Sequence, residues 1–140
     1  MNIYCAGAIK GDISYQQYYK IIIEEVAKRN INALSELNIK LQLKTKLNDK
    51  EIYERDIQWL NNSKAMIAEV SGASLGVGFE IGYALFHLNI PVLALYHKNV
   101  DKVSAMITGC SSPLLDIFQY AETDELKEYI NNFILKIKSL

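Results

Sequence analysis

The sequence predicts a doubly wound α/β fold, in which helices cover both faces of a five-stranded parallel sheet. Five apolar runs of strand length recur along the chain, and segments with helical spacing separate most of them. The runs are nearly continuous in apolar residues, which is typical of strands buried on both faces. The expected strands are Asn2–Ala6, Ile31–Ser35, Ala65–Val70, Pro91–Tyr96 and Ile117–Ala121.

Capping signals predict where the first two helices begin. The first helix is expected to start at a capping box formed by Ser14 and Gln17, and to end near Asn30. The second is expected to start near Asn48, because Glu51 follows three residues later and repeats the capping-box spacing.

Three further helices complete the predicted alternation of strands and helices. Residues 75–88, with the sequence LGVGFEIGYALFHL, predict a helix whose first turn is rich in glycine. A short helix is expected over Asp101–Gly109, and an amphipathic one over Asp124–Lys138. The polar stretch 36–47 is expected to be a loop.

The composition favours one soluble domain over residues 1–140. Half of the residues are hydrophobic, which is enough for one substantial core. The chain has fifteen basic and sixteen acidic residues, so its charges nearly balance. We therefore expect neither a nucleic-acid polymer nor a membrane as a partner. Cys5 and Cys110 lack the spacing of a zinc site or a disulfide framework. No signal peptide or membrane-spanning run is recognisable, and a reducing cytoplasm is the expected location.

The predicted sheet directs attention to the turns that follow its strands. In doubly wound sheets, ligands bind where the chain leaves the carboxyl end of a strand and enters a helix. The candidate turns are therefore Ala6–Gly11, Ser71–Gly78 and His97–Ser104.

The turn after the third strand combines hydroxyl groups with glycines. Ser71 and Ser74 supply the hydroxyl groups, and the glycines are Gly72, Gly76 and Gly78. Such a turn at the start of a helix can hold a phosphate on free backbone N–H groups. The spacing matches neither the dinucleotide fingerprint nor a P-loop. Tight packing of strand against helix explains the same glycines.

Glu80 lies in the first turn or so of the following helix. The positive end of a helix favours an ionised carboxylate by about 0.3 to 1 kcal/mol. An ionised carboxylate can attack an anomeric carbon. Helix stability alone also explains a glutamate at this place.

Asp56 is unusual because a helical wheel places it within an apolar arc. That arc is formed by Ile52, Tyr53, Ile57, Trp59 and Leu60. A buried carboxylate without a partner holds its proton more tightly, as a general acid requires. A structural hydrogen bond to a neighbouring loop explains it equally well. With Glu80 it makes the pair of carboxylates that glycosidic bond cleavage uses, although spacing in sequence does not show that the two meet.

Two hydroxyl side chains are further candidates. Tyr4 lies near the carboxyl end of the first strand, where its hydroxyl can orient Glu80 or simply belong to a core tyrosine. Ser104 lies at a helix start, where N-capping is the commoner explanation. His87 and His97 have no ligand spacing, and we assign them no role.

Four segments carry a resemblance to a known family. They are IYCAGAIKG, ERDIQWLNNS, AEVSGASLGVGFEIGYAL and VSAMITG, and they occur in the family's order from Met1 to about Tyr120. In these segments the chain resembles the 2'-deoxynucleoside 5'-phosphate N-hydrolases, within the nucleoside 2-deoxyribosyltransferase superfamily. Residues 1–140 would form one such domain.

The resemblance implies a Rossmann- or flavodoxin-like fold, a homodimer, and hydrolysis of deoxynucleoside monophosphates to free base and deoxyribose 5-phosphate. It implies no cofactor and no metal. Glu80 would be the nucleophile that forms a covalent glycosyl intermediate. Asp56 would act at the sugar or in proton transfer, and Tyr4 would place its hydroxyl beside Glu80.

The resemblance also assigns the residues that hold the nucleotide. Ser74 would bind the 5'-phosphate beside the turn glycines, and Ser104 would reach the phosphate from the neighbouring subunit. The first turn would wrap the nucleotide through Gly7, Ile9, Lys10 and Gly11. The family commonly has serine at Ala8 and arginine at Lys10. One phosphate hydroxyl is therefore missing, which weakens binding by about 1.5 to 3 kcal/mol unless Lys10 or water replaces it.

Other activities fit the same residues. A nucleoside 2'-deoxyribosyltransferase would pass the sugar to a second base, and a ribonucleotide N-glycosidase of the CMP type would accept a 2'-hydroxyl. From a different class, a nucleotide sensor would keep the pocket without catalysis. The presence of both Asp56 and Glu80 argues against a sensor, because binding alone does not need two carboxylates at a sugar. Base preference depends on the loop 36–47 and is not predicted.

Overall fold

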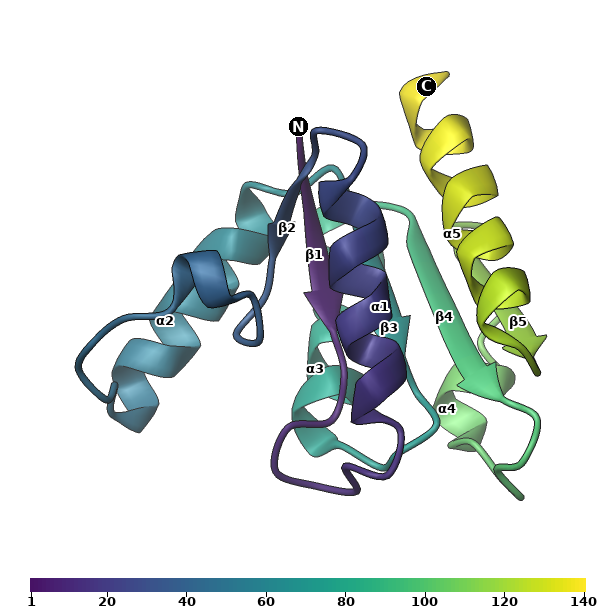
Figure 1. Cartoon of the computed structure of the whole chain (residues 1–140), viewed down its shortest axis with the longest axis horizontal. Coiled ribbons are helices and arrows are strands. Elements are labelled where there is room, and N and C mark those ends of the chain that lie inside the picture. Colours follow the sequence, from purple (N-terminus) through teal and green to yellow (C-terminus); the bar gives the residue numbers. More distant parts are fainter.

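The computed structural model describes residues 1–140 and contains one five-stranded parallel sheet. The strand order is β2-β1-β3-β4-β5, so the predicted doubly wound, flavodoxin-like fold is confirmed (Figure 1). The strands are β1 (Asn2–Ala6), β2 (Asn32–Leu34), β3 (Ala65–Glu69), β4 (Val92–His97) and β5 (Leu115–Tyr120).

Helices cover both faces of this sheet. One face lies beneath α1 (Gln16–Ala27) and α5 (Thr123–Lys138), and the other lies against α2 (Asp49–Asn61), α3 (Leu75–Gly82) and α4 (Ala105–Thr108) (Figure 1). Two short elements complete the chain, the 3-10 turn η1 (Ile39–Leu41) and the π-helix η2 (Tyr83–Leu88), which continues α3. No helix has both the length and the apolar character needed to cross a bilayer.

Alternation along the strands divides the core into two layers. Successive side chains of a strand point to opposite faces of the sheet. Ile3 and Cys5 therefore join the core beneath α1 and α5, whereas Tyr4 and Ala6 join the core beside α2 and α3. This register sends the Tyr4 side chain toward α3.

The start of the first helix differs from the prediction. Helix α1 begins at Gln16, and its N-cap Tyr15 makes no side-chain hydrogen bond. Ser14 instead donates its backbone N–H and its hydroxyl to Oδ1 of Asp12, at 3.0 and 2.6 Å. The predicted Ser14 capping box is wrong because Asp12 is a competing local acceptor. The helical residues end at Ala27, before the predicted end near Asn30.

The second predicted capping box is confirmed. The Asn48 side chain accepts from the Glu51 N–H at 2.9 Å, and the Glu51 side chain accepts from the Asn48 N–H at 3.0 Å. The short helix expected over Asp101–Gly109 is limited to α4, because Ser104 caps it by accepting from the Met106 N–H.

Candidate active site

An open pocket of about 1370 Å³ lies at the carboxyl ends of the strands, next to the switch point between β1 and β3. Its lining includes every site residue that the sequence predicted, although these residues come from five separate segments of the chain. They are Tyr4, Gly7, Ile9, Lys10, Gly11, Asp56, Ser74, Gly76, Gly78, Glu80 and Ser104. The fold thus brings the candidates together, while their roles stay predictions.

Glu80 and Tyr4 form a direct contact in this pocket. The Tyr4 hydroxyl donates a hydrogen bond to Oε2 of Glu80, from the interior strand β1 to helix α3. Burial raises the pKa of Glu80 to about 7. The hydrogen bond from Tyr4 acts in the opposite direction, because it favours the ionised carboxylate.

The helix dipole contributes less at Glu80 than the sequence suggested. Helix α3 begins at Leu75, which places Glu80 in the second turn. The effect of the dipole falls off within the first turn. Burial is the largest influence on the pKa of this carboxyl group; Tyr4 favours its ionisation most strongly, and the charge of Arg55 favours it to a smaller extent.

Asp56 has a partner that the sequence analysis did not consider. The Arg55 side chain donates from Nε to Oδ1 of Asp56 at 2.9 Å. The same guanidinium lies over the Trp59 ring, 4.6 Å from its centroid. Burial raises the pKa of Asp56, and Arg55 opposes that rise. The charge of Asp56 also raises the pKa of Glu80, so the two carboxylates interact electrostatically.

The two serines of the turn between β3 and α3 make different hydrogen bonds. Ser74 caps α3, and its hydroxyl accepts from the Val77 N–H at 3.3 Å. No acceptor in the chain takes the N–H groups of Leu75 and Gly76, so both are available to an anion. Ser71 is buried, and its hydroxyl is engaged by Glu69 and by the backbone of His97. Of the two turn hydroxyls, that of Ser71 is therefore occupied within the chain.

The turn after β1 is packed tightly against the turn after β3. A Cβ on Gly11 would lie 2.3 Å from the carbonyl oxygen of Ala73, so only glycine fits there without a shift. The Asp12 N–H donates to that same oxygen at 3.3 Å. The two turns predicted to hold the nucleotide thus support each other.

Ala8 lies outside the pocket. Its side chain is 8% exposed and lines a separate small cavity with Asp12, Tyr15 and Gln16. Its neighbours Gly7 and Ile9 line the pocket, whereas Ala8 itself does not.

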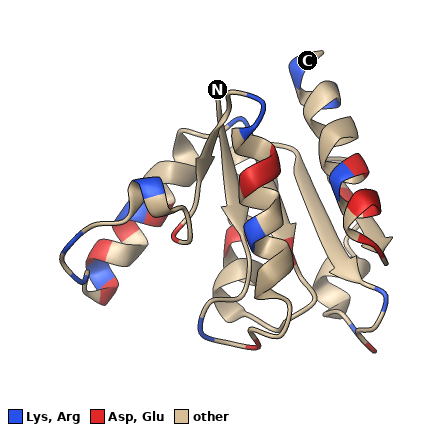
Figure 2. Ribbon diagram, in the orientation of Figure 1, with Lys and Arg blue, Asp and Glu red and all other residues tan.

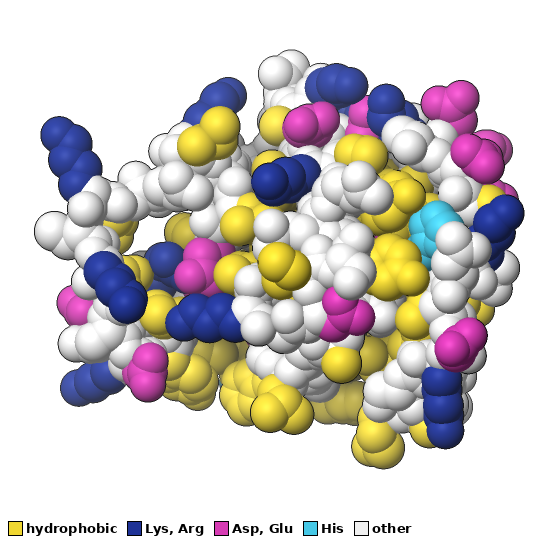
Figure 3. Space-filling model, turned by 60° about the horizontal axis from the view of Figure 1, so that its bottom comes forward, with side chains coloured by type: hydrophobic (Ala, Val, Ile, Leu, Met, Phe, Trp, Pro, Cys, Tyr) yellow, Lys and Arg dark blue, Asp and Glu magenta, His cyan; other side chains and the backbone are white.

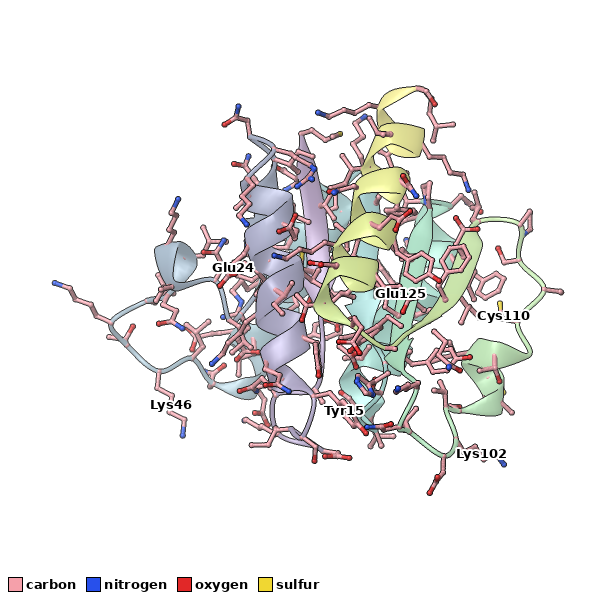
Figure 4. The ribbon with its side chains drawn as sticks, turned by 45° about the vertical axis from the view of Figure 1, so that its right-hand side comes forward. Tyr15, Glu24, Lys46, Lys102, Cys110 and Glu125 are labelled. Carbon is pink, nitrogen blue, oxygen red and sulfur yellow. The ribbon has the colours of Figure 1, made fainter.

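Several pocket residues were missed by sequence reasoning. Glu36 follows β2 and its charge raises the pKa of both Glu80 and Asp56. The rule that selected the other turns would have found it, had the short strand β2 been included. Lys102 also lines the pocket and lies on the loop before α4 (Figure 4). Arg55 does not line the pocket; it belongs to α2, where both signs of charge alternate (Figure 2), and it acts through its contact with Asp56. Nothing local in the sequence marked either cation.

No three His, Cys, Asp or Glu side chains lie close enough together to hold a metal ion. The fold and the pocket define a flavodoxin-like domain with two interacting carboxylates and free helix N–H groups at its ligand-binding edge. Residues 3–125 match the family model described as Nucleoside 2-deoxyribosyltransferase, and the chain belongs to this family. With its relatives, this makes the protein an enzyme of the N-glycosidase and N-hydrolase class.

Two relatives are similar over nearly the whole chain. The 5-hydroxymethyl-dUMP N-hydrolase of Danio rerio is 36% identical, over 95% of this chain and 95% of its own. A protein of Methanosarcina mazei, named provisionally as 2'-deoxynucleoside 5'-phosphate N-hydrolase 1, is 35% identical over 95% of this chain and 83% of its own.

A solved structure shares the fold at low identity. The CMP N-glycosidase of Clostridium botulinum superposes with a TM-score of 0.66 over 97% of this chain and 99% of its own. The two sequences are 12% identical, so this likeness concerns the fold alone.

Proposed function

We propose that this protein hydrolyses the N-glycosidic bond of 2'-deoxynucleoside 5'-monophosphates, and that residues 1–140 form one such domain. The observation that carries the proposal is the contact of Tyr4 with Glu80, beside Asp56, in a pocket that also holds free N–H groups of α3. The names of the two relatives above support the substrate class.

The proposed reaction has two steps. An oxygen of the Glu80 carboxylate attacks C1' of the sugar, and the bond from C1' to the base nitrogen breaks as the base takes up a proton. Water then hydrolyses the resulting ester, which releases deoxyribose 5-phosphate and restores Glu80. Tyr4 orients the carboxylate. Asp56, fixed by Arg55, holds the sugar or passes the proton.

The 5'-phosphate is proposed to bind at the start of α3. Ser74 and the N–H groups of Leu75 and Gly76 provide donors at the positive end of this helix. Lys10 adds a flexible cation from the opposite turn. This arrangement favours hydrolysis of monophosphates over transfer between free nucleosides, because a nucleoside leaves these donors without an anion.

A homodimer is also part of the proposal. Leu75, Phe86 and Met106 are 97%, 70% and 85% exposed, and exposed apolar groups of this kind mark interaction surfaces. Figure 3 looks onto the pocket end and shows hydrophobic side chains gathered along the edge formed by α3 and α4. Ser104 borders Met106 there, and we propose that it reaches the phosphate held by the partner subunit.

A panel assay tests the proposed activity. Purified protein is incubated with ribo- and deoxyribonucleosides and with their monophosphates, and the products are separated by chromatography. We expect free base and deoxyribose 5-phosphate from deoxynucleoside monophosphates. A new nucleoside after addition of a second base would indicate a transferase, and release from ribonucleotides alone would indicate a CMP-type enzyme. Binding without any turnover, unchanged in Glu80→Ala, would indicate a sensor.

A further inference from the structure

A further buried carboxylate, Glu69, lies behind the site, and the mechanism above does not use it. Glu69 is the last residue of β3 and is 3% exposed. Its partner Tyr120 belongs to the core beneath α1 and α5, on the face of the sheet opposite Glu80. Burying a carboxylate is costly unless hydrogen bonds compensate it, so its presence requires an explanation.

Donors from two parts of the fold converge on Glu69. The Ser71 N–H donates to Oε1 at 2.6 Å, and the Ser71 hydroxyl donates to Oε2 at 3.0 Å. The Tyr120 hydroxyl also donates to Oε2. Burial raises the pKa of Glu69 to about 7, while the donors from Tyr120 and Ser71 favour the ionised form.

The network continues into the neighbouring strand. The Ser71 hydroxyl accepts from the His97 N–H at 2.7 Å, so one carboxylate connects the carboxyl ends of β3, β4 and β5. The His97 ring lies against Tyr120 and against Tyr15, with ring centroids 5.3 and 5.6 Å apart. Tyr15, labelled in Figure 4, is the N-cap of α1. The network is buried and surrounded by aromatic rings.

The segment that Glu69 holds leads directly to the phosphate donors. Ser71 is followed by Gly72, where an added Cβ would lie 2.1 Å from the Asp12 carbonyl oxygen. Ser74 and the free N–H groups of α3 come next. Fixing Ser71 therefore fixes where these donors point, because the intervening residues are pressed against the first turn.

We propose that Glu69 is a positioning residue for phosphate binding, which holds the Ser71 turn so that the Ser74 hydroxyl and the first N–H groups of α3 face the 5'-phosphate. The inference rests on the proposed function. Glu69 itself touches no substrate. Its carboxylate suits this task because a glutamine amide nitrogen is a donor and would oppose one of the donors it now receives.

The variant Glu69→Gln is compared with Glu25→Gln. Glu25 is an equally buried glutamate, 4% exposed, but its partners Lys28 and Arg29 follow the end of α1, far from the turn in sequence. Ser71→Ala is the second test variant. It keeps the carboxylate and removes only the hydroxyl that bridges to His97, so it stays informative if Glu69→Gln fails to fold.

Two measurements separate positioning from general stability. They are KM and kcat for a deoxynucleoside monophosphate, and the Kd of deoxyribose 5-phosphate by calorimetry, both well below the melting temperature. We expect Glu69→Gln to raise KM and Kd by about tenfold or more with a smaller change in kcat, as for a lost set of bonds to a charged group. Ser71→Ala should shift both in the same direction, and Glu25→Gln should leave both unchanged.

Unchanged Kd and KM in folded Glu69→Gln and Ser71→Ala would overturn the inference, as would equal changes in Glu25→Gln. The proposed function fails in a different way, since the wild-type protein would then neither hydrolyse a deoxynucleoside monophosphate nor bind deoxyribose 5-phosphate. In that case the inference falls with it. Normal wild-type binding with an unaffected Glu69→Gln refutes the inference alone.

Discussion

Two opposing influences act on the carboxyl group of Glu80. Burial and the charges of Asp56 and Glu36 disfavour its ionised form, whereas the hydrogen bond from Tyr4 favours it. Only the carboxylate is a nucleophile. Tyr4 is therefore expected to control how much of the enzyme is reactive at a given pH, in addition to orienting the side chain.

The variant Tyr4→Phe tests this role. Without the hydroxyl, the pKa of Glu80 should rise above about 7, because a hydrogen bond to the ionised form is lost. We expect the fall of kcat/KM at acid pH to move to higher pH, with a rate at neutral pH reduced about tenfold or more. The pH profile of kcat/KM measures the shift. An acid limb at the wild-type position would show that Tyr4 does not set this pKa.

The raised pKa of Glu80 also predicts the sign of a stability change. The pKa is raised from 4.5 to about 7, so the folded state holds this proton more tightly than the unfolded state. The resulting stability is fully present below the unfolded pKa and is lost as pH rises through about 7. The glutamine in Glu80→Gln is neutral at every pH. The melting temperature of this variant should therefore exceed that of the wild type at pH 8, and the difference should be smaller at pH 5. A difference in melting temperature that does not depend on pH would contradict the raised pKa of Glu80.

The β3–α3 turn is packed against the turn after β1 and, in the proposed site, also holds the ligand. Its glycines differ in what surrounds them. A Cβ on Gly72 would meet backbone at 2.1 Å, whereas a Cβ on Gly78 would meet nothing within 4 Å. Gly72 is therefore required by packing. Gly78 lines the pocket in open space, as expected where a ligand or a partner chain approaches closely.

Alanine substitutions should separate these two kinds of glycine. Gly72→Ala is expected to lower the free energy of unfolding by about 1 to 3 kcal/mol, because the turn must move. Gly78→Ala should raise it by about 0.5 to 1 kcal/mol, because alanine favours a helix, and should nevertheless weaken substrate binding. Urea unfolding measures the free energy of unfolding, and KM reports the change in substrate binding. Equal destabilisation by both substitutions would refute the distinction.

The elements were largely predictable because their signals are local. The Asn48 box needs only Glu51 three residues away, and it forms as expected. The Ser14 box fails because Asp12, also local, is a better-placed acceptor. The positions of strands and helices therefore follow from the pattern of apolar residues. The first residue of a helix depends on which nearby side chain accepts the hydrogen bonds at its start.

The site was predictable in membership and less so in chemistry. Glu80, Asp56 and Tyr4 were identified from motifs and from the expected sheet edge, and they line one pocket. The ionisation of Glu80 was not predictable, since it depends on burial by residues distant in sequence. The pairing of Asp56 with Arg55 depends on how α2 lies against the sheet, which no spacing reveals.

At the scale of the whole molecule, the pocket is larger than one nucleotide requires. Its volume of about 1370 Å³ exceeds the roughly 300 to 1,000 Å³ of most ligand pockets. The exposed Leu75, Phe86 and Met106 extend this space outward over α3 and α4. A second subunit placed on that surface would narrow the pocket and bring its own Ser104 close to the phosphate.

Mixing two inactive variants tests the shared site. Glu80→Gln and Ser104→Ala are each expected to be impaired alone, the second by about 1.5 to 3 kcal/mol in kcat/KM. If Ser104 acts across a two-fold interface, subunit exchange creates heterodimers with one intact site. Activity should then rise toward about one quarter of the wild-type value. Activity that merely averages the two separate variants would place Ser104 in its own subunit's site, or show that the protein is monomeric.

A covalent intermediate on Glu80 is detected directly by the intact mass of the protein during turnover of a slow substrate. A 2'-fluoro arabinonucleoside 5'-monophosphate suits this purpose, because fluorine disfavours the positively charged transition state and the intermediate accumulates. We expect the wild-type protein to gain the mass of the fluorinated sugar phosphate, peptide mapping to place that mass on the peptide containing Glu80, and Glu80→Gln to gain nothing. Base release by the wild-type protein without this adduct, or an adduct that persists in Glu80→Gln, would exclude Glu80 as the nucleophile.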